Sequence, residues 1–148
     1  YFSNSVKGDE DVNAKRVLPF WNLEKDYDTL VKWWKQHEFE LPVPKDVLPP
    51  LGIMIEEDNV PICTAGLYED YKRTKFGFMF GLFTNPDIGK IKLYKAMNMC
   101  LQEINKLARV KNLGLVYTIT GESALFKLYE KNNKRIVTTS ITLSKCIF

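Results

Sequence analysis

The chain has 148 residues, of which 45% are hydrophobic and 13% aromatic, and its formal net charge at pH 7 is +3. A chain of this length and composition can bury the core of one domain but is short for two. The charge is small and its signs are mixed along the chain, which slightly favours a small anionic ligand and argues against a nucleic-acid reader. No apolar run approaches the roughly 20 residues that cross a bilayer, so we expect a cytoplasmic protein without a membrane partner.

Cysteine and histidine are too few for the common metal and nucleophile motifs. The three cysteines, Cys63, Cys100 and Cys146, are widely spaced and set among apolar residues, which is typical of reduced thiols in a cytosolic core. His37 is the only histidine, which excludes zinc motifs and catalytic arrangements that need a second imidazole. We therefore expect no metal cofactor.

The first elements are a tail, a strand and a helix. Residues 1–15 are polar and aperiodic, so we expect a flexible tail, part of which could be an expression-tag remnant, before a single domain over residues 16–148. Residues 16–20 predict a strand, and Asn22 can cap a helix. The apolar residues of that helix share one face: Tyr27, Leu30, Val31 and Trp34. Trp33 lies off this face and either borders a ligand groove or, more simply, packs at the edge of the apolar stripe.

A run of strands follows. Residues 41–50 contain four prolines and should form an extended connection. Residues 52–56 and 60–68 predict two strands joined by a hairpin turn. Residues 76–84 form a third strand, so apolar and aromatic that we expect it to be central and buried on both faces. Three strands linked by short turns predict an antiparallel meander.

A turn and a long helix follow this central strand. Asn-Pro-Asp-Ile-Gly at 85–89 is dense in turn residues. Apolar residues then recur at helical spacing, at Ile91, Tyr94, Met97, Leu101, Ile104 and Ala108. A helix that begins over the carboxyl end of a strand presents free N–H groups and the positive end of its dipole, which can receive an anion.

The last elements complete a mixed sheet. Residues 115–120 predict a strand parallel to its predecessor, because a helix joins the two. Residues 122–131 predict a short helix, and residues 136–147 predict one long strand or two short ones. The order is β-α-(loop)-β-β-β-α-β-α-β, a mixed α/β domain with a central sheet of six to seven strands flanked by helices.

This layout resembles the GNAT-type N-acetyltransferases, a family of acyl-CoA N-acyltransferases. The runs LGIMIEEDNVPICTAGLYED, FTNPD and SALFKLYEKNN are similar to small bacterial and phage members. The resemblance implies that acetyl-CoA is a co-substrate and binds where the fourth and fifth strands separate. Its pantetheine would lie along Gly81, Leu82, Phe83 and Thr84. Its pyrophosphate would rest on Ile88, Gly89, Lys90, Ile91 and Lys92.

The phosphate loop departs from the family pattern Arg/Gln-x-x-Gly-x-Gly/Ala, because only its middle glycine, Gly89, is present. Lys90, Lys92 and Lys95 lie in or beside the first helical turns. Cations there oppose the helix dipole unless an anion binds. The alternative is a basic face that is merely solvated.

The family resemblance also implies a catalytic acid. Tyr129, in the run Leu-Tyr-Glu-Lys-Asn-Asn, is similar to the tyrosine that protonates the departing CoA thiolate. A phenol with a pKa near 10 can supply that proton. The alternative is a core tyrosine whose hydroxyl reaches the surface. A general base stays open between Glu69, Asp70, Glu122 and His37; each acid fits a solvated turn, and His37 fits a helix-end cation.

The function hypothesis is transfer of acetyl from acetyl-CoA to a primary amine by direct attack. The acceptor would be a small molecule or a peptide amine, and a homodimer through the terminal strands is compatible with the sequence. The alternative is a catalytically degenerate GNAT-like fold that acts as a binding or assembly module.

Overall fold

The computed structural model describes residues 16–18, 22–39, 42–70, 72, 74–119 and 123–132. Its strands are β1 (Arg16–Leu18), β2 (Leu51–Glu57), β3 (Val60–Glu69), β4 (Phe76–Thr84) and β5 (Leu115–Tyr117). Its helices are α1 (Leu23–Gln36), α2 (Lys90–Val110) and α3 (Ser123–Asn132), with one 3-10 turn, η1 (Lys45–Val47). Within these described ranges, no helix is long and apolar enough to span a membrane.

The strands form one sheet in the order β1-β2-β3-β4-β5. Strands β1 to β4 pair antiparallel with their neighbours, and β5 pairs parallel with β4. The predicted meander and the predicted parallel crossover are therefore confirmed. The described part of the sheet has the five strands named above, so the predicted count of six to seven is not confirmed, because residues 136–147 lie outside the described ranges.

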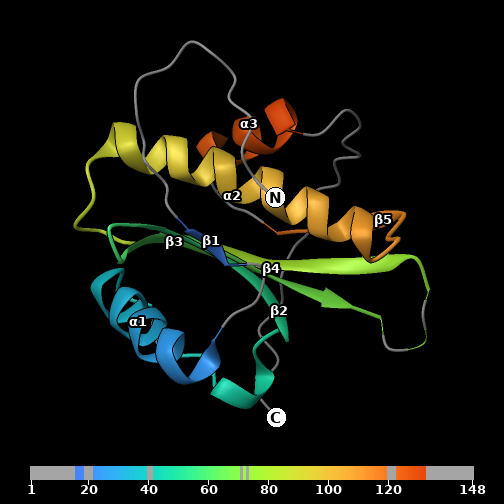
Figure 1. Ribbon diagram of the computed structural model, residues 1–148, viewed down its shortest axis with the longest axis horizontal. Coiled ribbons are helices and arrows are strands. Elements are labelled where there is room, and N and C mark those ends of the chain that lie inside the picture. Colours follow the sequence, from blue (N-terminus) through green and yellow to red (C-terminus); the bar gives the residue numbers. More distant parts are fainter. Residues whose placement is uncertain are drawn as a thin grey trace.

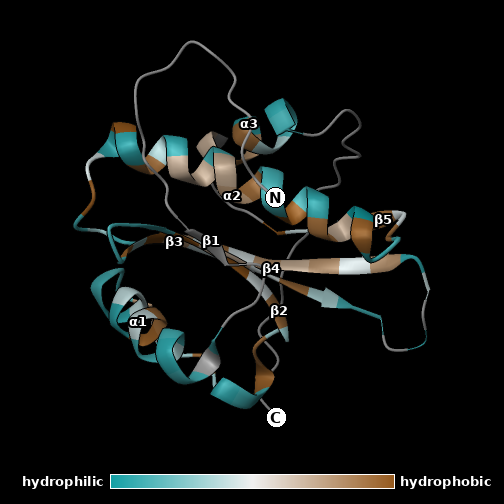
Figure 2. Ribbon diagram, viewed as in Figure 1, coloured by the Kyte–Doolittle hydropathy of each residue, from teal (hydrophilic) through white to brown (hydrophobic). Residues whose placement is uncertain are grey.

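The sheet separates two helical layers. Helix α1 lies on one face, and α2 and α3 cover the other (Figure 1). Hydrophobic residues concentrate on the strands between these layers (Figure 2). The alternation of side chains along a strand supplies both layers: Ile53 and Ile55 of β2 pack toward α2, and Met54 between them packs toward α1.

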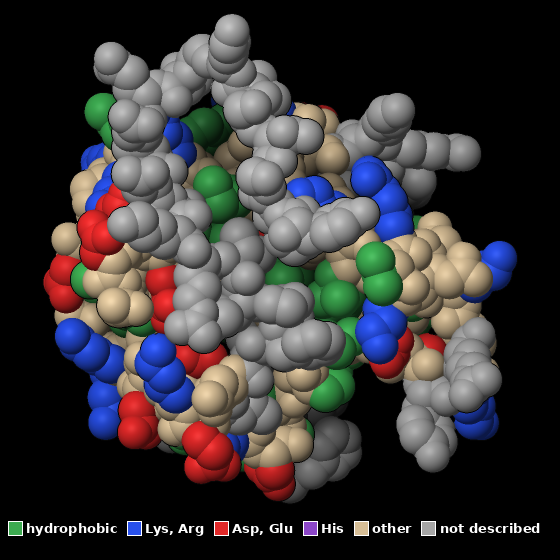
Figure 3. All heavy atoms as spheres, in the orientation of Figure 1, with side chains coloured by type: hydrophobic (Ala, Val, Ile, Leu, Met, Phe, Trp, Pro, Cys, Tyr) green, Lys and Arg blue, Asp and Glu red, His purple; other side chains and the backbone are tan. Residues whose placement is uncertain are grey.

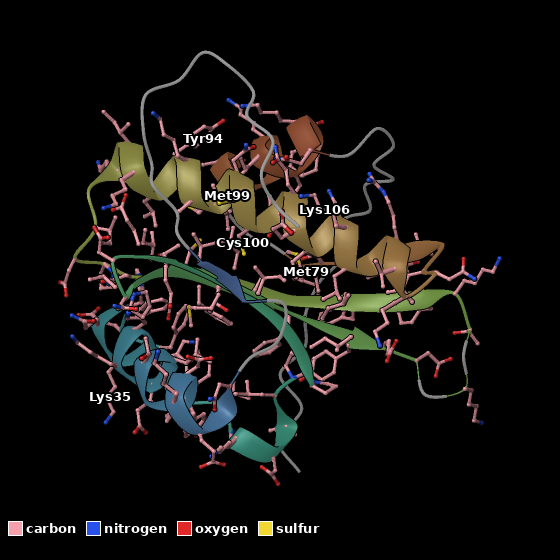
Figure 4. The ribbon with its side chains drawn as sticks, viewed as in Figure 1. Lys35, Met79, Tyr94, Met99, Cys100 and Lys106 are labelled. Carbon is pink, nitrogen blue, oxygen red and sulfur yellow. The ribbon has the colours of Figure 1, made fainter. Side chains whose placement is uncertain are left out.

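The α2/α3 side holds the larger core. Its fully buried members include Ile62 and Leu67 of the sheet and Ala96 of α2. Cys63 and Cys100 are buried there as free thiols, as predicted from the sequence, while Cys146 lies outside the described residues. Figure 4 shows Cys100 and Met79 in the layer between α2 and β4.

The α1 side holds a smaller core of large side chains. Trp33 is 2% exposed and packs beside Leu30, Trp34, Leu48 and Met54. The simpler interpretation of Trp33 is therefore confirmed, and the ligand-groove interpretation is wrong.

Two burial predictions were also wrong. In β4 only Gly77 and Met79 are buried, and Phe76 is 39% exposed, because β5 and α1 cover only part of this strand. In α2, Ile91 is 79% and Tyr94 49% exposed. The predicted Leu101, Ile104 and Ala108 are buried in the apolar stripe that packs on the sheet, together with Ala96, Cys100 and Leu107.

Candidate functional site at the open edge of strand β4

Strand β4 extends beyond its partner on one side. The parallel pairing starts at Phe76↔Leu115 and ends at Phe78↔Tyr117, where β5 also ends. Among the described residues, the stretch of β4 from Met79 to Thr84 therefore has no strand beside it on this edge. An unpaired edge presents backbone N–H and C=O groups that can pair with another extended molecule.

The backbone of Thr84 faces this open edge. Its neighbour Asn85 donates its N–H to Ile62 of β3, at 2.8 Å, so Asn85 faces the opposite edge. Successive residues of a strand send their backbone groups to alternate edges. The N–H and C=O of Thr84 therefore point away from β3, where an added strand would lie.

A β-bulge bends β4 in the middle of the open stretch. Between the pairs Gly66↔Phe80 and Thr64↔Phe83, β4 has the two residues Gly81 and Leu82 where β3 has one. Gly81 has a φ of +61°, and a Cβ at this position would lie 2.5 Å from the Phe83 ring. Only glycine fits this geometry without strain. The bulge was not predicted, although a glycine inside a strand is its usual sequence signal.

The turn after β4 is fixed to β3 by Asn85. Its side-chain amide donates to the carbonyl of Pro61 at 2.9 Å, and its side-chain oxygen accepts the N–H of Asp87 at 3.0 Å. Gly89 is the N-cap of α2, and a Cβ built on it would meet nothing within 4 Å. The predicted turn and helix are confirmed, and they place the beginning of α2 directly after the open edge.

The beginning of α2 has the properties of an anion site. Its first turn contains no acidic residue, and among the described residues no side chain caps it, so its N–H groups keep their capacity to bind an anion. Lys90 is exposed. Lys92 forms an ion pair with Glu57 at the end of β2, so it is not simply solvated. The side chain of Ile91 is 79% exposed and does not pack over this helix start.

The visible surface shows no segregated charge. Figure 3 shows basic and acidic side chains intermixed on the face presented, with hydrophobic side chains among them. Tyr94 lies on the outer side of α2 (Figure 4), where Lys131 sits 5.5 Å from its ring centre.

Tyr129, the predicted acid, is 6% exposed and packs in the larger core with Leu128. It lies on α3, which packs against α2. The ring is therefore part of the core whether or not the residue acts as an acid. That its hydroxyl protonates the CoA thiolate stays a prediction.

Two of the candidate bases are engaged away from the bulge. Glu69 pairs with Lys111 at 3.4 Å. Asp70 accepts hydrogen bonds from the Thr74 hydroxyl and the Lys72 N–H, which lower the pKa of its carboxyl. Both acids lie where β3 pairs with the beginning of β4, at the opposite end of the strand from Thr84. Glu122 lies outside the described residues.

His37 lies at the open edge instead. It is the C-cap of α1, and its Nε2 is 3.0 Å from the carbonyl oxygen of Thr84 and 3.3 Å from the Thr84 hydroxyl. The sequence placed His37 at the end of the first helix, correctly, but gave no signal for this contact, because the two residues are 47 positions apart in the chain.

A buried acidic pair under α1 was not predicted. Asp26 and Glu56 are each 1% exposed. Asp26 accepts the N–H of Asn22 at 2.8 Å, yet burial, joined by the charge of Glu56, raises the pKa of its carboxyl. Glu56 lies 3.8 Å from the Lys25 ammonium, and neither of its oxygens has a hydrogen-bond partner in the described part of the chain.

Several solved structures have a similar fold. An inferred acetyltransferase from Agrobacterium tumefaciens matches with a TM-score of 0.66 at 14% identity, over 88% of this chain and 99% of that one. An acetyltransferase from Trypanosoma brucei matches with a TM-score of 0.61 at 12% identity, over 88% and 99%. The chain has the GNAT acetyltransferase fold. The fold class predicted from the sequence is therefore confirmed.

A third structure with a similar fold was solved in complex with CoA. The aminoglycoside N-acetyltransferase AAC(6')-Iy in complex with CoA matches with a TM-score of 0.56 at 15% identity, over 89% of this chain and 100% of that one. No protein-family model matches the sequence, and no curated protein matches it. At identities of 12–15%, the likeness establishes the fold alone.

Proposed function

We propose that this protein transfers the acetyl group of acetyl-CoA to a primary amine by direct attack of the amine on the thioester. One observation carries this proposal. Beyond Phe78, β4 is bulged, its edge opposite β3 has no strand beside it among the described residues, and a short turn leads from it to a helix start that has lysines and no acid. This combination offers an extended molecule a backbone edge, followed at once by a site for its anionic end.

Each part of the cofactor has a matching part of the chain. The amides of the pantetheine arm would pair with the open edge from Gly81 to Thr84. The pyrophosphate would rest on the residues from Ile88 to Lys92, where the N–H groups of α2 and the lysines offset its charge. An N–H at the bulge would stabilise the oxyanion that forms when the amine adds to the thioester. Tyr129 would protonate the CoA sulfur as the C–S bond breaks.

The acceptor we propose is a small-molecule amine. Phe39 follows α1 and is 53% exposed, with its ring 6.4 Å from that of Phe83 on β4. These rings offer an apolar surface and a favourable contact for a cation near the open edge. One of the fold neighbours is an aminoglycoside N-acetyltransferase, so the fold supports acetylation of small polyamines elsewhere.

Titration calorimetry with acetyl-CoA tests the cofactor assignment before any acceptor is known. We expect binding, together with a rise in melting temperature. A transfer assay with a panel of amines then tests the reaction. The absence of any thermal shift at about millimolar acetyl-CoA would contradict the proposal.

Replacing Tyr129 by phenylalanine tests the acid. We expect Tyr129→Phe to lower turnover by about 100-fold or more while acetyl-CoA still binds, because the ring stays in the core and only the hydroxyl is lost. Tyr94→Phe is the matched control, because its ring lies on the outer side of α2. Equal turnover in the two variants would exclude Tyr129 as the acid.

The alternative, a degenerate fold that only binds a partner, makes the opposite prediction. It requires that acetyl-CoA fails to bind or that no amine is acetylated. The fold comparison does not favour it, because the neighbours reported above are acetyltransferases.

A further inference from the structure

We propose that His37 is the proton acceptor for the amine. This inference rests on the proposed acetyl transfer and assigns its missing base. A primary amine near a pKa of 10 is mostly protonated at neutral pH, and it must lose a proton to form the amide. His37 is the side chain that the structure brings from α1 to the open edge of β4, and it is the chain's only histidine.

The hydrogen bond to Thr84 determines which ring nitrogen can take the proton. A carbonyl oxygen can only accept a hydrogen bond, so Nε2 of His37 carries the hydrogen in the contact of 3.0 Å. In a neutral imidazole the other nitrogen, Nδ1, then has the free lone pair. Within the described residues, Nδ1 has no hydrogen-bond partner. Thr84 therefore holds the ring in the tautomer that a base requires.

The imidazole of His37 is open to solvent and has no ion-pair partner among the described residues. His37 is exposed, and no acid of the described residues lies within ion-pair distance of it. The charged neighbours along the chain are the exposed Lys35 and Glu38, and Thr84 and Phe39 are the contacts from the other sides. The ring is therefore accessible to water and to a substrate amine.

The position also suits the reaction. The Phe39 ring lies 6.2 Å from the imidazole and 6.4 Å from Phe83, so an amine that contacts these rings is close to His37. Thr84 is three residues after Gly81, a separation of roughly 10 Å along a strand. The proton would therefore pass from the amine to Nδ1 through water.

The proton balance closes without another reactant. The protonated amine first releases one proton to solvent. The neutral amine then adds to the thioester carbonyl, and the ammonium of the tetrahedral intermediate gives a second proton to His37. The C–S bond breaks as the amide forms, and the thiolate takes a proton from Tyr129. Solvent then carries the proton of His37 back to the tyrosine, which leaves the amide and CoA thiol as products.

The pH dependence of kcat/KM in His37→Gln tests this role. A glutamine side-chain amide can still donate to the Thr84 carbonyl, but it cannot take up a proton. We expect wild-type kcat/KM to rise with pH along a limb that reports the loss of one proton from the enzyme, and His37→Gln to lose this limb and at least about tenfold in rate. Its affinity for acetyl-CoA should stay within about twofold of wild type, because Thr84 keeps its donor.

Two further measurements separate a base from a structural contact. Since His37 is the only histidine, its imidazole signal in the NMR spectrum of the untagged protein is unique, and its pKa should equal that of the kinetic limb. Lys35→Gln removes an exposed charge from the last turn of the same helix. This matched control should keep the limb.

Each outcome decides the inference. If wild type acetylates amines and His37→Gln keeps the limb and the rate, His37 is not the base and the proposed function stands. If His37→Gln loses acetyl-CoA affinity and rate in parallel, His37 only supports the β4 edge, and the inference is again wrong. If wild type binds acetyl-CoA but acetylates nothing, the proposed function itself fails, and the inference fails with it.

Discussion

The two faces of the sheet are built from different side chains. Between the sheet and α2/α3, the core consists of aliphatic residues, two thiols and the single aromatic ring of Tyr129. Between the sheet and α1 lie two tryptophans and the edge phenylalanines, beside the carboxylates Asp26 and Glu56. Apolar burial stabilises a fold, whereas buried charge costs stability unless it is fully paired. The α2/α3 face is therefore the more uniformly apolar of the two, and the α1 face also contains buried charge.

A large-to-small change on the α2/α3 face should have the largest effect. Leu67 of β3 is fully buried there. We expect Leu67→Ala to lower the free energy of unfolding by about 2–5 kcal/mol, through lost apolar contacts and a new cavity. Urea denaturation measures this loss.

Val110→Ala is the control for this comparison. Val110 ends α2 and is 80% exposed, so its truncation should change stability by less than about 0.5 kcal/mol. A similar loss in both variants would mean that the α2/α3 core is not the main source of stability.

A substitution at the bulge should have the next largest effect, because it should lower both the stability of the fold and the affinity for acetyl-CoA. Gly81→Ala puts a side chain at a φ of +61° and against the Phe83 ring, which should cost about 1–2 kcal/mol or more. We also expect weaker acetyl-CoA binding, since the displaced strand would lose its alignment with the cofactor. Calorimetry and denaturation measure the two effects.

Gly89→Ala is the matched glycine variant. Gly89 has a φ of −62° and open space at its Cβ position, so stability should change little. If the pyrophosphate approaches this backbone closely, affinity for acetyl-CoA should still fall. Equal losses of stability in the two glycine variants would contradict the strain assigned to Gly81.

Local sequence patterns predicted the regular elements of the fold but not the contacts between residues that are far apart in the chain. Periodicity predicted α2 and the meander, because repeated apolar burial determines these elements. It wrongly predicted that Ile91 and Tyr94 face the core, because the spacing of apolar residues does not indicate where a helix extends beyond the sheet that it covers. The His37–Thr84 contact, the Asp26–Glu56 pair and the exposure of β4 depend on neighbours far along the chain. Local patterns carry no signal for such contacts, so the candidate site was only partly predictable.

The acidic pair under α1 should have a smaller, pH-dependent effect. Burial raises the pKa of Asp26 above its value in the unfolded chain, so the folded state binds this proton more tightly. Stability from this group is thus greatest at low pH and falls as pH rises above about 4. We expect Asp26→Asn to be more stable than wild type at pH 7, by less than the loss in Gly81→Ala.

The pH profile of unfolding checks this assignment. The advantage of Asp26→Asn should shrink as pH falls toward about 4 and be absent below it, where the wild-type carboxyl is neutral in both the folded and the unfolded chain. Asp28→Asn is the control on the same helix, because Asp28 is exposed and its replacement should have little effect at either pH. Destabilisation by Asp26→Asn at pH 7 would show that the hydrogen bond from Asn22 outweighs the cost of the buried charge.

The smallest effect should appear at the beginning of α2, where Glu57 already neutralises Lys92. In Glu57→Gln the lysine becomes free for an anion, and we expect acetyl-CoA affinity to rise about two- to fivefold at low salt, the range of one partly exposed ion pair. Glu69→Gln breaks the comparable pair with Lys111 at the other end of β3 and should leave affinity unchanged. The gain in Glu57→Gln should vanish in high salt and in the Lys92→Met background. A gain that persists in Lys92→Met would mean that Glu57 repels the anion directly, so that Lys92 takes no part in binding the pyrophosphate.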